Sequence, residues 1–353
     1  MAGVLDIRRR IRSVRNTRQI TKAMKMVSAA RLRRTQERAL AARPYGQMIT
    51  NVLKSLVSRA EIFDPVTGEL AHPLLVRREE NNVLLIVVTG DRGLAGPFNT
   101  NILKAAARFI QSKTGKRIDI ETVGRKGRDY FRRRYKVVPW SAGAEGGTPA
   151  ERKAEIQLTG ELVGAFNKIE FTQARELAEN VIERYIRGEI DSAYLVFNEF
   201  KSVIAQRLIV EQILPIGHIG EREIRQAEEL SPEVRRQHAE AAATAGVGVR
   251  AADTREVDAR AAAFATKEVD YIYEQPPAEI FRDLLPKYVG VQIYRALLES
   301  VAAEHAARMT AMDAATNNAS DMIDSLTLAM NRARQAKITK EIIEIVSGAT
   351  AAQ

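Results

Sequence analysis

The chain has 353 residues, of which 45% are hydrophobic, so it is long enough for two ordinary domains and is not disordered as a whole. It contains no cysteine, which excludes disulfides, thiol nucleophiles, thiol redox switches and cysteine-type zinc sites. Its 54 basic and 44 acidic residues give a net charge of +10. The longest apolar run, residues 83–88, is far shorter than the roughly 20 residues of a membrane-spanning helix.

The basic charge is concentrated at the start of the chain. Residues 1–43 hold 13 lysines and arginines against only Asp6 and Glu37, so the rest of the chain is almost neutral. A basic arm of this kind predicts an acidic partner, either phosphate or carboxylate. No apolar segment follows the first arginines, which excludes a secretory signal, although an arginine-rich start also imitates an organellar transit peptide.

The first expected element is a long N-terminal helix. Residues 4–43 contain neither glycine nor proline, and Val4, Ile7, Ile11 and Val14 follow the three-four spacing of a coiled-coil seam. A continuous helix over this range would be ~60 Å long, which is longer than most globular helices.

The middle of the chain predicts an open α/β sheet with helices around it. The β-rich runs cover residues 83–88, 117–123, 193–200 and 206–214. Helical patterns are expected at residues 99–111 and 159–187.

The loop at residues 89–99 follows a strand and opens a helix, where α/β folds bind phosphates on backbone N–H groups. It lacks the Lys-Ser/Thr pair of a Walker A loop, and Gly90, Gly93 and Gly96 do not fit the G-x-G-x-x-G pattern. Pro97 also removes one donor at the helix start. We interpret this loop as a structural tight turn, and a nucleotide-using enzyme built on it would lack catalytic residues.

The composition changes after residue 216. Residues 217–269 are rich in Ala, Glu, Arg and Gly and contain few large hydrophobic residues. This composition predicts an insertion that is partly helical or mobile and builds no packed core.

A second long helix is expected at the end of the chain. Residues 291–347 contain no glycine or proline and would span ~85 Å as one helix. Alternating steps of three and four give a mostly apolar, alanine-rich seam: Leu298, Val301, His305, Arg308, Met312, Ala315, Ala319, Met322, Leu326, Ala329, Ala333 and Ala336. Such a seam predicts half of a coiled coil whose partner helix approaches closely.

The two terminal helices are the obvious partners of one another. Antiparallel pairing follows if the middle of the chain folds at one end of the rod. The alternative is two independent amphipathic helices packed on a globular core. His305 and Arg308 interrupt the seam one turn apart, so they either set the register or contact a partner.

The sequence gives little support to a metal site or a nucleic-acid site. The four histidines are dispersed and none has H-x-x-x-H spacing, so no metal site is expected. The basic arm could bind nucleic acid, but its arginines share turns with apolar residues and residues 1–43 lack the stacking aromatics of a single-strand binder. A basic coiled-coil scaffold that binds nucleic acid remains the alternative function.

Three segments resemble the ATP synthase γ subunit family. Residues 7–29 are similar to its N-terminal helix, and Ser300 with residues 304–319 and 338–349 is similar to its C-terminal helix. The interior loop also resembles that of the family in Asp91-Arg92-Gly93-Leu94 and Phe98-Asn99, with variations at Ala95 and Pro97.

The resemblance implies a fold of α/β class plus a long antiparallel coiled coil made by the two termini, around a central Rossmann-like open α/β domain. The implied boundaries are an N-terminal coiled-coil helix at 1–60, the α/β domain at 75–216, the insertion at 217–269 and a C-terminal coiled-coil helix at 280–353. It disfavours the transit-peptide interpretation, because the matching helix begins within a few residues of Met1.

The resemblance also implies a function. The rod would be the central stalk of a proton-driven F-type ATP synthase, rotating inside a ring of catalytic α and β subunits, with the ε subunit and the membrane c-ring as further partners. The chain would have no catalytic residues, metal or cofactor of its own. It would be a peripheral membrane protein, on the cytoplasmic face of a bacterial plasma membrane because no presequence is seen.

The residues carried over as contacts to the catalytic ring lie on both terminal helices, and the alternative role for each of them is to stabilise the coiled coil. They are Lys22, Met24, Lys25, Arg308, Arg334, Gln335, Thr339, Glu341 and Glu344. Partly exposed ion pairs with carboxylates of the ring would contribute only ~0–1 kcal/mol each, which suits a shaft that must release one partner and meet the next.

The segment at 217–269 departs from the usual family pattern. It falls about where chloroplast members carry a cysteine-containing regulatory insert, but thiol control is impossible without cysteine. A mechanical brake is the hypothesis, in which case deleting residues 221–265 raises ATP hydrolysis and leaves assembly intact.

Overall fold

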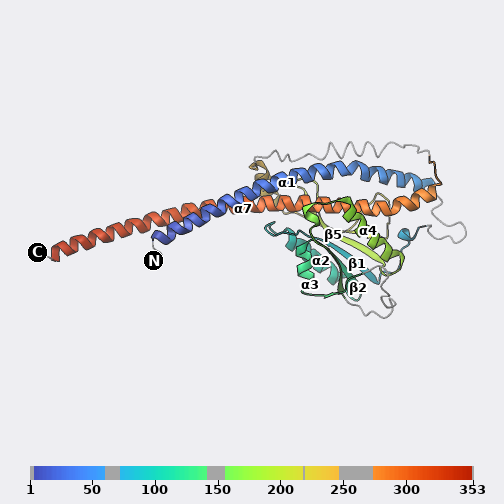
Figure 1. Ribbon diagram of the computed structural model, residues 1–353, viewed down its shortest axis with the longest axis horizontal. Helices are drawn as coiled ribbons and strands as arrows, with labels where there is room; N and C mark the ends of the chain where they lie inside the picture. Colours follow the sequence, from blue (N-terminus) through green and yellow to red (C-terminus); the bar gives the residue numbers. More distant parts are fainter. Residues whose placement is uncertain (1–3, 60–71, 141–155, 218, 246–272, 352–353) are drawn as a thin grey trace.

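Two long helices and a sheet domain with shorter helices make up the computed structural model (Figure 1). Helices α1 (Val4–Arg59) and α7 (Pro277–Ala351) run antiparallel as a long rod, and both chain termini lie toward the same end of it. The sheet domain lies along one side of the other half of the rod. The described residues are 4–59, 72–140, 156–217, 219–245 and 273–351.

Both rod helices continue through an internal proline. Pro44 lies inside α1 and Pro286 inside α7, although a proline removes one helical hydrogen bond. In α1 the turns after Pro44 are held by the burial of Ile49, Leu53 and Leu56 in the main core. Packing of this apolar stripe therefore outweighs the local preference to end the helix.

The sheet has seven strands in the order β3-β4-β2-β1-β5-β6-β7. The central pairings among β1, β2, β4 and β5 are parallel, whereas β6 and β7 are added antiparallel. Nearly every residue of β1 and β2 is buried, as expected for parallel strands covered on both faces. The strands are β1 (Asn82–Val88), β2 (Arg117–Val123), β3 (Lys136–Val137), β4 (Ile156–Leu162), β5 (Ser192–Phe200), β6 (Gln206–Leu214) and β7 (Glu223–Glu229).

The helices form layers on the sheet. Helices α2 and α3 pack against each other and against β1 and β2, whereas α4 packs against α7. Helix α5 also packs against α7. The helices between the rod helices are α2 (Phe98–Ser112), α3 (Arg125–Arg132), α4 (Phe171–Ile186) and α5 (Pro232–Ala243), with short 3₁₀ turns at Pro73–Leu75 and Ala165–Asn167.

The structure confirms the predicted fold class and corrects two of its parts. The helix expected over 159–187 is α4 alone, because residues 156–162 form strand β4, paired with β2. The insertion at 217–269 contributes an ordered strand and a helix, β7 and α5, so its beginning extends the sheet. Its remainder from residue 246 lies outside the described residues. Within the described part of the chain, no helix is both long and apolar enough to traverse a bilayer.

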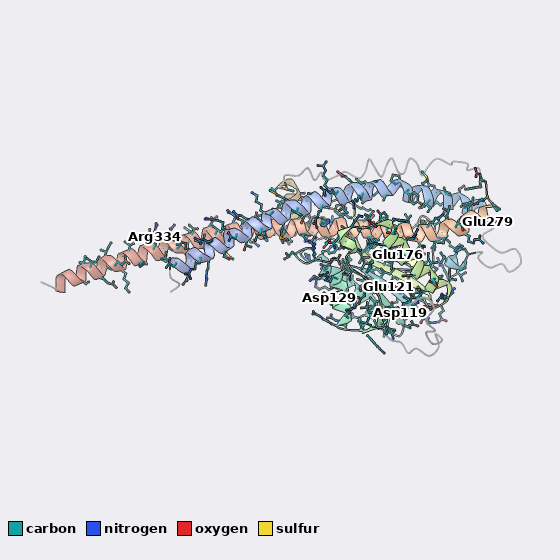
Figure 2. All side chains as sticks on the ribbon, in the orientation of Figure 1. Asp119, Glu121, Asp129, Glu176, Glu279 and Arg334 are labelled. Atoms are coloured by element: carbon teal, nitrogen blue, oxygen red, sulfur yellow. The ribbon has the colours of Figure 1, made fainter. Side chains whose placement is uncertain are left out.

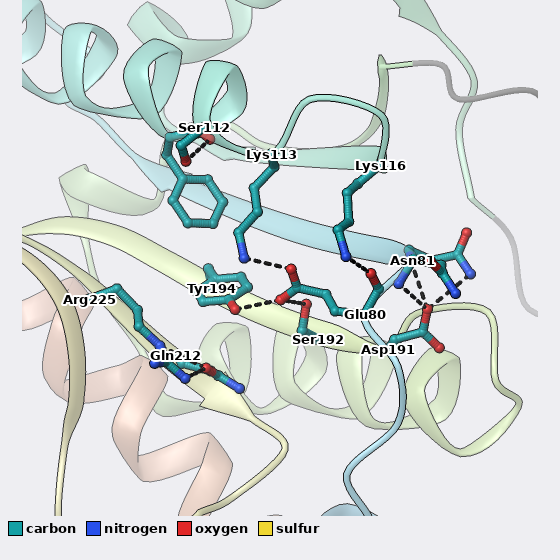
Figure 3. A network of polar contacts seen from close by, with 12 residues as sticks. Glu80, Asn81, Ser112, Lys113, Lys116, Asp191, Ser192, Tyr194, Gln212 and Arg225 are labelled. Carbon is teal, nitrogen blue, oxygen red and sulfur yellow. Dashed lines mark hydrogen bonds and ion pairs between the residues drawn. The ribbon is translucent and has the colours of Figure 1, made fainter.

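A polar cluster fastens the segment before β1 to β5 and α2 (Figure 3). The Glu80 carboxylate accepts hydrogen bonds from Lys113 Nζ at 2.5 Å, Tyr194 Oη at 2.6 Å and Ser192 Oγ at 3.0 Å. Burial acts to raise the pKa of Glu80, but these donors hold that pKa below its ordinary value. Asp191 accepts from the backbone N–H of Asn82 at 2.7 Å, so the starts of the neighbouring central strands β1 and β5 are held in register.

Gly124 is required where β2 turns into α3. Its φ is +93°, and a Cβ there would lie 2.0 Å from the Thr89 backbone oxygen. We expect Gly124→Ala to cost about 1–3 kcal/mol of unfolding free energy, measured by urea denaturation. The matched control is Gly115→Ala, since Gly115 has φ +83° with nothing within 4 Å of its Cβ position. Equal losses in the two variants would show that the close approach to Thr89 does not matter.

Candidate functional site

The rod is held together by a small apolar cluster near the chain termini. Ile7 and Ile11 of α1 pack with Ile323 of α7, all three being buried. Partly buried residues extend this cluster on both helices, namely Val14, Leu326, Met330 and Ala333. The predicted antiparallel coiled coil is therefore formed, with the first turns of α1 beside residues 323–333.

Polar side chains connect the helices further along. Arg18 donates to Ser320 at 3.5 Å, the hydroxyls of Thr21 and Thr316 are 2.8 Å apart, and Lys25 forms an ion pair with Asp313 at 2.5 Å. These three pairs step in opposite directions along the two helices and fix one register. An alanine-rich seam allows several alignments of the two helices. Hydrogen bonds and ion pairs require specific partners, so these pairs select one register.

Helix α7 runs well past the start of α1, and its free end is apolar on several sides. With α1 beginning beside residue 333, the rest of α7 has no helix of the described chain next to it (Figure 1). The exposed apolar residues on this end are Ile338, Ile342, Ile343, Ile345 and Val346, with Ile345 72% exposed. Contiguous exposed aliphatic residues are typical of a surface that binds another protein.

The predicted ring-contact residues fall into two groups. Lys22 is exposed on α1, and Arg334, Gln335, Thr339, Glu341 and Glu344 are exposed on the last part of α7, while Met24 is half-buried. Figure 2 labels Arg334 near the point where α7 passes the start of α1. Glu341 and Glu344 form exposed pairs of 3.5 Å with lysines one turn away, which contribute little stability.

Lys25 and Arg308 are bound within the chain. Lys25 is 6% exposed and donates to both Asp313 and Thr244, the residue that follows α5. Arg308 is buried beside Glu304, which accepts from it at 2.6 Å. Their contact with a ring stays a prediction and requires these internal pairs to open.

Arg308 belongs to a joint between the sheet domain and the rod. It donates to the Gly93 carbonyl at 3.2 Å, in the loop after β1. A Cβ on Gly90 would lie 2.5 Å from Glu304 Oε1, so only glycine lets this carboxylate approach the loop so closely. The Gly90 N–H is bonded to Asn99 Oδ1 at 2.8 Å. These contacts support the interpretation of residues 89–99 as a structural turn that holds the rod.

Charge at this joint is controlled by burial. Burial raises the pKa of Glu304, and Arg308 opposes the rise. Burial, with help from Arg308 and Arg31, lowers the pKa of His305 to about 3, so its imidazole is neutral near pH 7. His305 therefore adds no charge to the joint. The seam pattern pointed to His305 and Arg308 but not to Glu304, whose spacing of four residues from Arg308 on an apolar helix was the available signal.

A rod of two antiparallel helices, carried by an open α/β sheet and ending in one unpaired apolar helix, defines a coiled-coil shaft protein. A family model described as ATP synthase matches residues 4–352. The ATP synthase gamma chain of Solibacter usitatus is 47% identical over 353 residues, with all of both chains covered, and that of Anaeromyxobacter sp. strain Fw109-5 is 41% identical, with 99% of each covered.

A solved structure shows the same fold. A chain of the Euglena gracilis mitochondrial ATP synthase, in a structure of OSCP, F1 and the c-ring, has a TM-score of 0.52 at 17% identity, covering 99% of this chain and 94% of that one. The chain belongs to the ATP synthase γ-chain family. It is thus a peripheral part of the complex that synthesises ATP, and the nucleic-acid scaffold is disfavoured.

Proposed function

We propose that the rod is the rotor shaft of a proton-driven ATP synthase. The unpaired apolar end of α7 is the observation that carries this proposal, because it offers a slender, exposed surface with no partner in the described chain. Such an end fits inside a sleeve formed by the catalytic α and β subunits. The asymmetric rod would then present different faces to successive catalytic sites and shift their affinities in turn.

The remaining parts of the proposal concern the other partners. The sheet domain, held to the rod by the Glu304 joint, would transmit torque from the c-ring and would contact the ε subunit. Catalysis would take place on the ring, with no catalytic residue in this chain. The complex would lie on the cytoplasmic face of a bacterial plasma membrane.

A single introduced cysteine tests whether the α and β subunits enclose the free end of α7. Because the chain has no cysteine, Ile343→Cys introduces a single reactive site, and Ile343 is 58% exposed. We expect maleimide to label the purified full-length variant rapidly and the variant assembled with α and β subunits on the order of tenfold more slowly, since interface cores exclude water. Val137→Cys, on the exposed edge strand β3, is the control and should label equally in both states. Equal labelling of Ile343→Cys in both states would contradict the proposal.

We also propose that the insertion restrains the shaft. The support is a hydrogen bond of 2.7 Å from Lys25 of α1 to Thr244, beyond the end of α5, which itself packs on α7. Deleting residues 221–265 is no longer the best test, because that segment includes β7 and Arg222, whose guanidinium binds Glu211. A point variant leaves the sheet intact.

The variant Thr244→Val removes the acceptor for Lys25, together with the hydroxyl's own hydrogen bond of 2.8 Å to the Glu240 carbonyl within α5. We expect the assembled complex to hydrolyse ATP faster, by up to about tenfold, which corresponds to the ~1.4 kcal/mol of one charge-assisted hydrogen bond. Arg236→Gln is the control, since Arg236 is exposed on α5 and makes only a surface pair of 3.8 Å with Glu240. Hydrolysis unchanged by Thr244→Val would rule out a brake acting through this contact.

A further inference from the structure

A large cavity lies between the rod and the sheet domain. Its volume is about 1120 Å³, and its walls come from residues 38–54 of α1, residues 288–299 of α7, the ends of β5 and β6, and the segments around Lys168 and Gly220. Pockets that hold small organic ligands are typically ~300–1,000 Å³, so a molecule of nucleotide size fits. The cavity is separate from the free end of α7 and from the joint at Glu304.

The floor of the cavity carries buried polar atoms that lack partners. Glu299 Oε2, Gln292 Oε1 and Arg295 Nε are each buried without a hydrogen bond from any described residue. The Glu299 side chain is 9% exposed, and burial raises its pKa to about 7 against the opposing effect of Arg295. Leaving such atoms unsatisfied costs about 1–3 kcal/mol each, so they indicate a missing donor-bearing group. Two of the three atoms are acceptors.

The rim of the cavity is cationic. Arg38, Lys54 and Lys201 are exposed at its edge and form no ion pair among the residues that the structure describes. Deeper in, Arg222 is already neutralised by Glu199 and Glu211. The unneutralised positive charge therefore lies at the mouth, where it attracts and holds an anion.

Aromatic side chains complete the walls between floor and rim. Tyr45, Tyr288 and Tyr294 line the cavity, and Phe171 meets Tyr294 edge to face with ring centroids 5.5 Å apart. Flat apolar faces of this kind pack well against a planar ring. The cavity thus offers a cationic mouth, aromatic walls and a floor of hydrogen-bond acceptors.

We infer that this cavity binds a nucleoside phosphate, with the phosphates at Arg38, Lys54 and Lys201 and the amino or hydroxyl donors of the nucleoside directed to Glu299 and Gln292. This ligand chemistry matches all three zones, whereas inorganic phosphate would leave the floor unsatisfied and an uncharged nucleoside would leave the rim unused. The inference goes beyond the rotor role and does not depend on it.

The test measures binding to the purified full-length chain by calorimetry, without α and β subunits and their nucleotide sites. The probes are ATP, adenosine and inorganic triphosphate at moderate salt. We expect saturable ATP binding, and clearly weaker binding of both adenosine and triphosphate. If ATP does not bind, the inference is overturned. If triphosphate binds as tightly as ATP, the floor of the cavity does not recognise the nucleoside. If adenosine binds as tightly as ATP, the cationic rim does not bind the phosphates. Either result would overturn the inference.

A matched pair of variants locates the site. Lys54→Ser removes one rim cation from α1, and we expect a roughly tenfold or greater loss of ATP affinity, as for one charge-assisted contact. Lys104→Ser removes the same charge from an exposed position of α2 away from the cavity and should leave affinity unchanged. If both variants lose the same ATP affinity, binding depends only on the net charge of the chain, and the assignment of ATP to this cavity is overturned.

Discussion

Replacing Arg184 by alanine should destabilise the sheet domain by about 3–5 kcal/mol, because the buried Glu121 loses its counter-charge and the buried Asp119 keeps only Arg117. Arg184 of α4 is 1% exposed and donates to Glu121 Oε1 at 3.2 Å and, over a very short contact, to Asp119. Burial raises the pKa of Glu121, and Arg184 is the main group opposing that rise. Figure 2 labels both acids within the sheet domain, on β2.

The loss of unfolding free energy can be measured by urea denaturation, followed by the fluorescence of the only tryptophan of the chain. Trp140 reports on this region, because its ring centroid lies 5.7 Å from the Arg184 guanidinium and its indole N–H donates to Glu189 at 2.8 Å. Arg175→Ala on the same helix is the control. Arg175 makes only an exposed pair of 3.4 Å with Glu179, so its removal should cost less than ~0.5 kcal/mol. A similar cost for both variants would show that the buried cluster does not hold α4 on the sheet.

The second large effect is expected at the joint between the sheet domain and the rod. Arg308→Ala removes the donor to the Gly93 carbonyl and leaves the buried Glu304 carboxylate without its partner. Breaking a buried pair in this way typically costs ~3–5 kcal/mol. Amide hydrogen exchange should also increase in residues 90–98, because the loop loses its tie to α7.

The unfolding free energy that Arg308→Ala loses relative to the wild type should depend on pH. Glu304 already has a raised pKa because of burial, and losing Arg308 raises it further. A carboxyl whose folded pKa exceeds its unfolded value opposes folding as pH rises above the unfolded value, so the variant should be closest to wild type near pH 5 and furthest at pH 8. In the wild type His305, with a pKa of about 3, does not titrate in this window, and burial, the largest cause of that low pKa, remains in the variant.

A double variant and a surface control test whether the loss comes from the unpaired Glu304 charge. The double variant Glu304→Leu with Arg308→Met removes both charges and should recover most of the lost stability, because well-packed apolar residues can replace a buried pair. Lys340→Ala, which removes one member of an exposed pair on the free end of α7, should have little effect. A single-variant deficit that is independent of pH, or that the double variant does not reduce, would contradict this account of the joint.

Much of the sheet could be predicted because several of its strands are short runs rich in β-branched and other apolar residues. The runs expected at 83–88, 117–123, 193–200 and 206–214 correspond closely to β1, β2, β5 and β6. Strand β7 could not be found in this way, since its residues Glu223–Glu229 are mostly exposed and polar. What holds β7 is its backbone hydrogen bonding to β6, which leaves little trace in composition.

The two long helices were predictable from helical periodicity and from the absence of helix breakers, which are local properties. The resemblance of residues 7–29 and 304–319 indicated the family, and antiparallel pairing of the helices was the expectation that followed. Which charged residues of those helices turn inward depends instead on the packing of distant segments. Lys25 and Arg308 look like their exposed neighbours in a basic sequence, but Asp313, Thr244, Glu304 and Gly93 reach them from distant or opposing segments. Such partners are fixed by the packing of the rod against the sheet domain, because the free energy of a buried charge depends on what surrounds it in space.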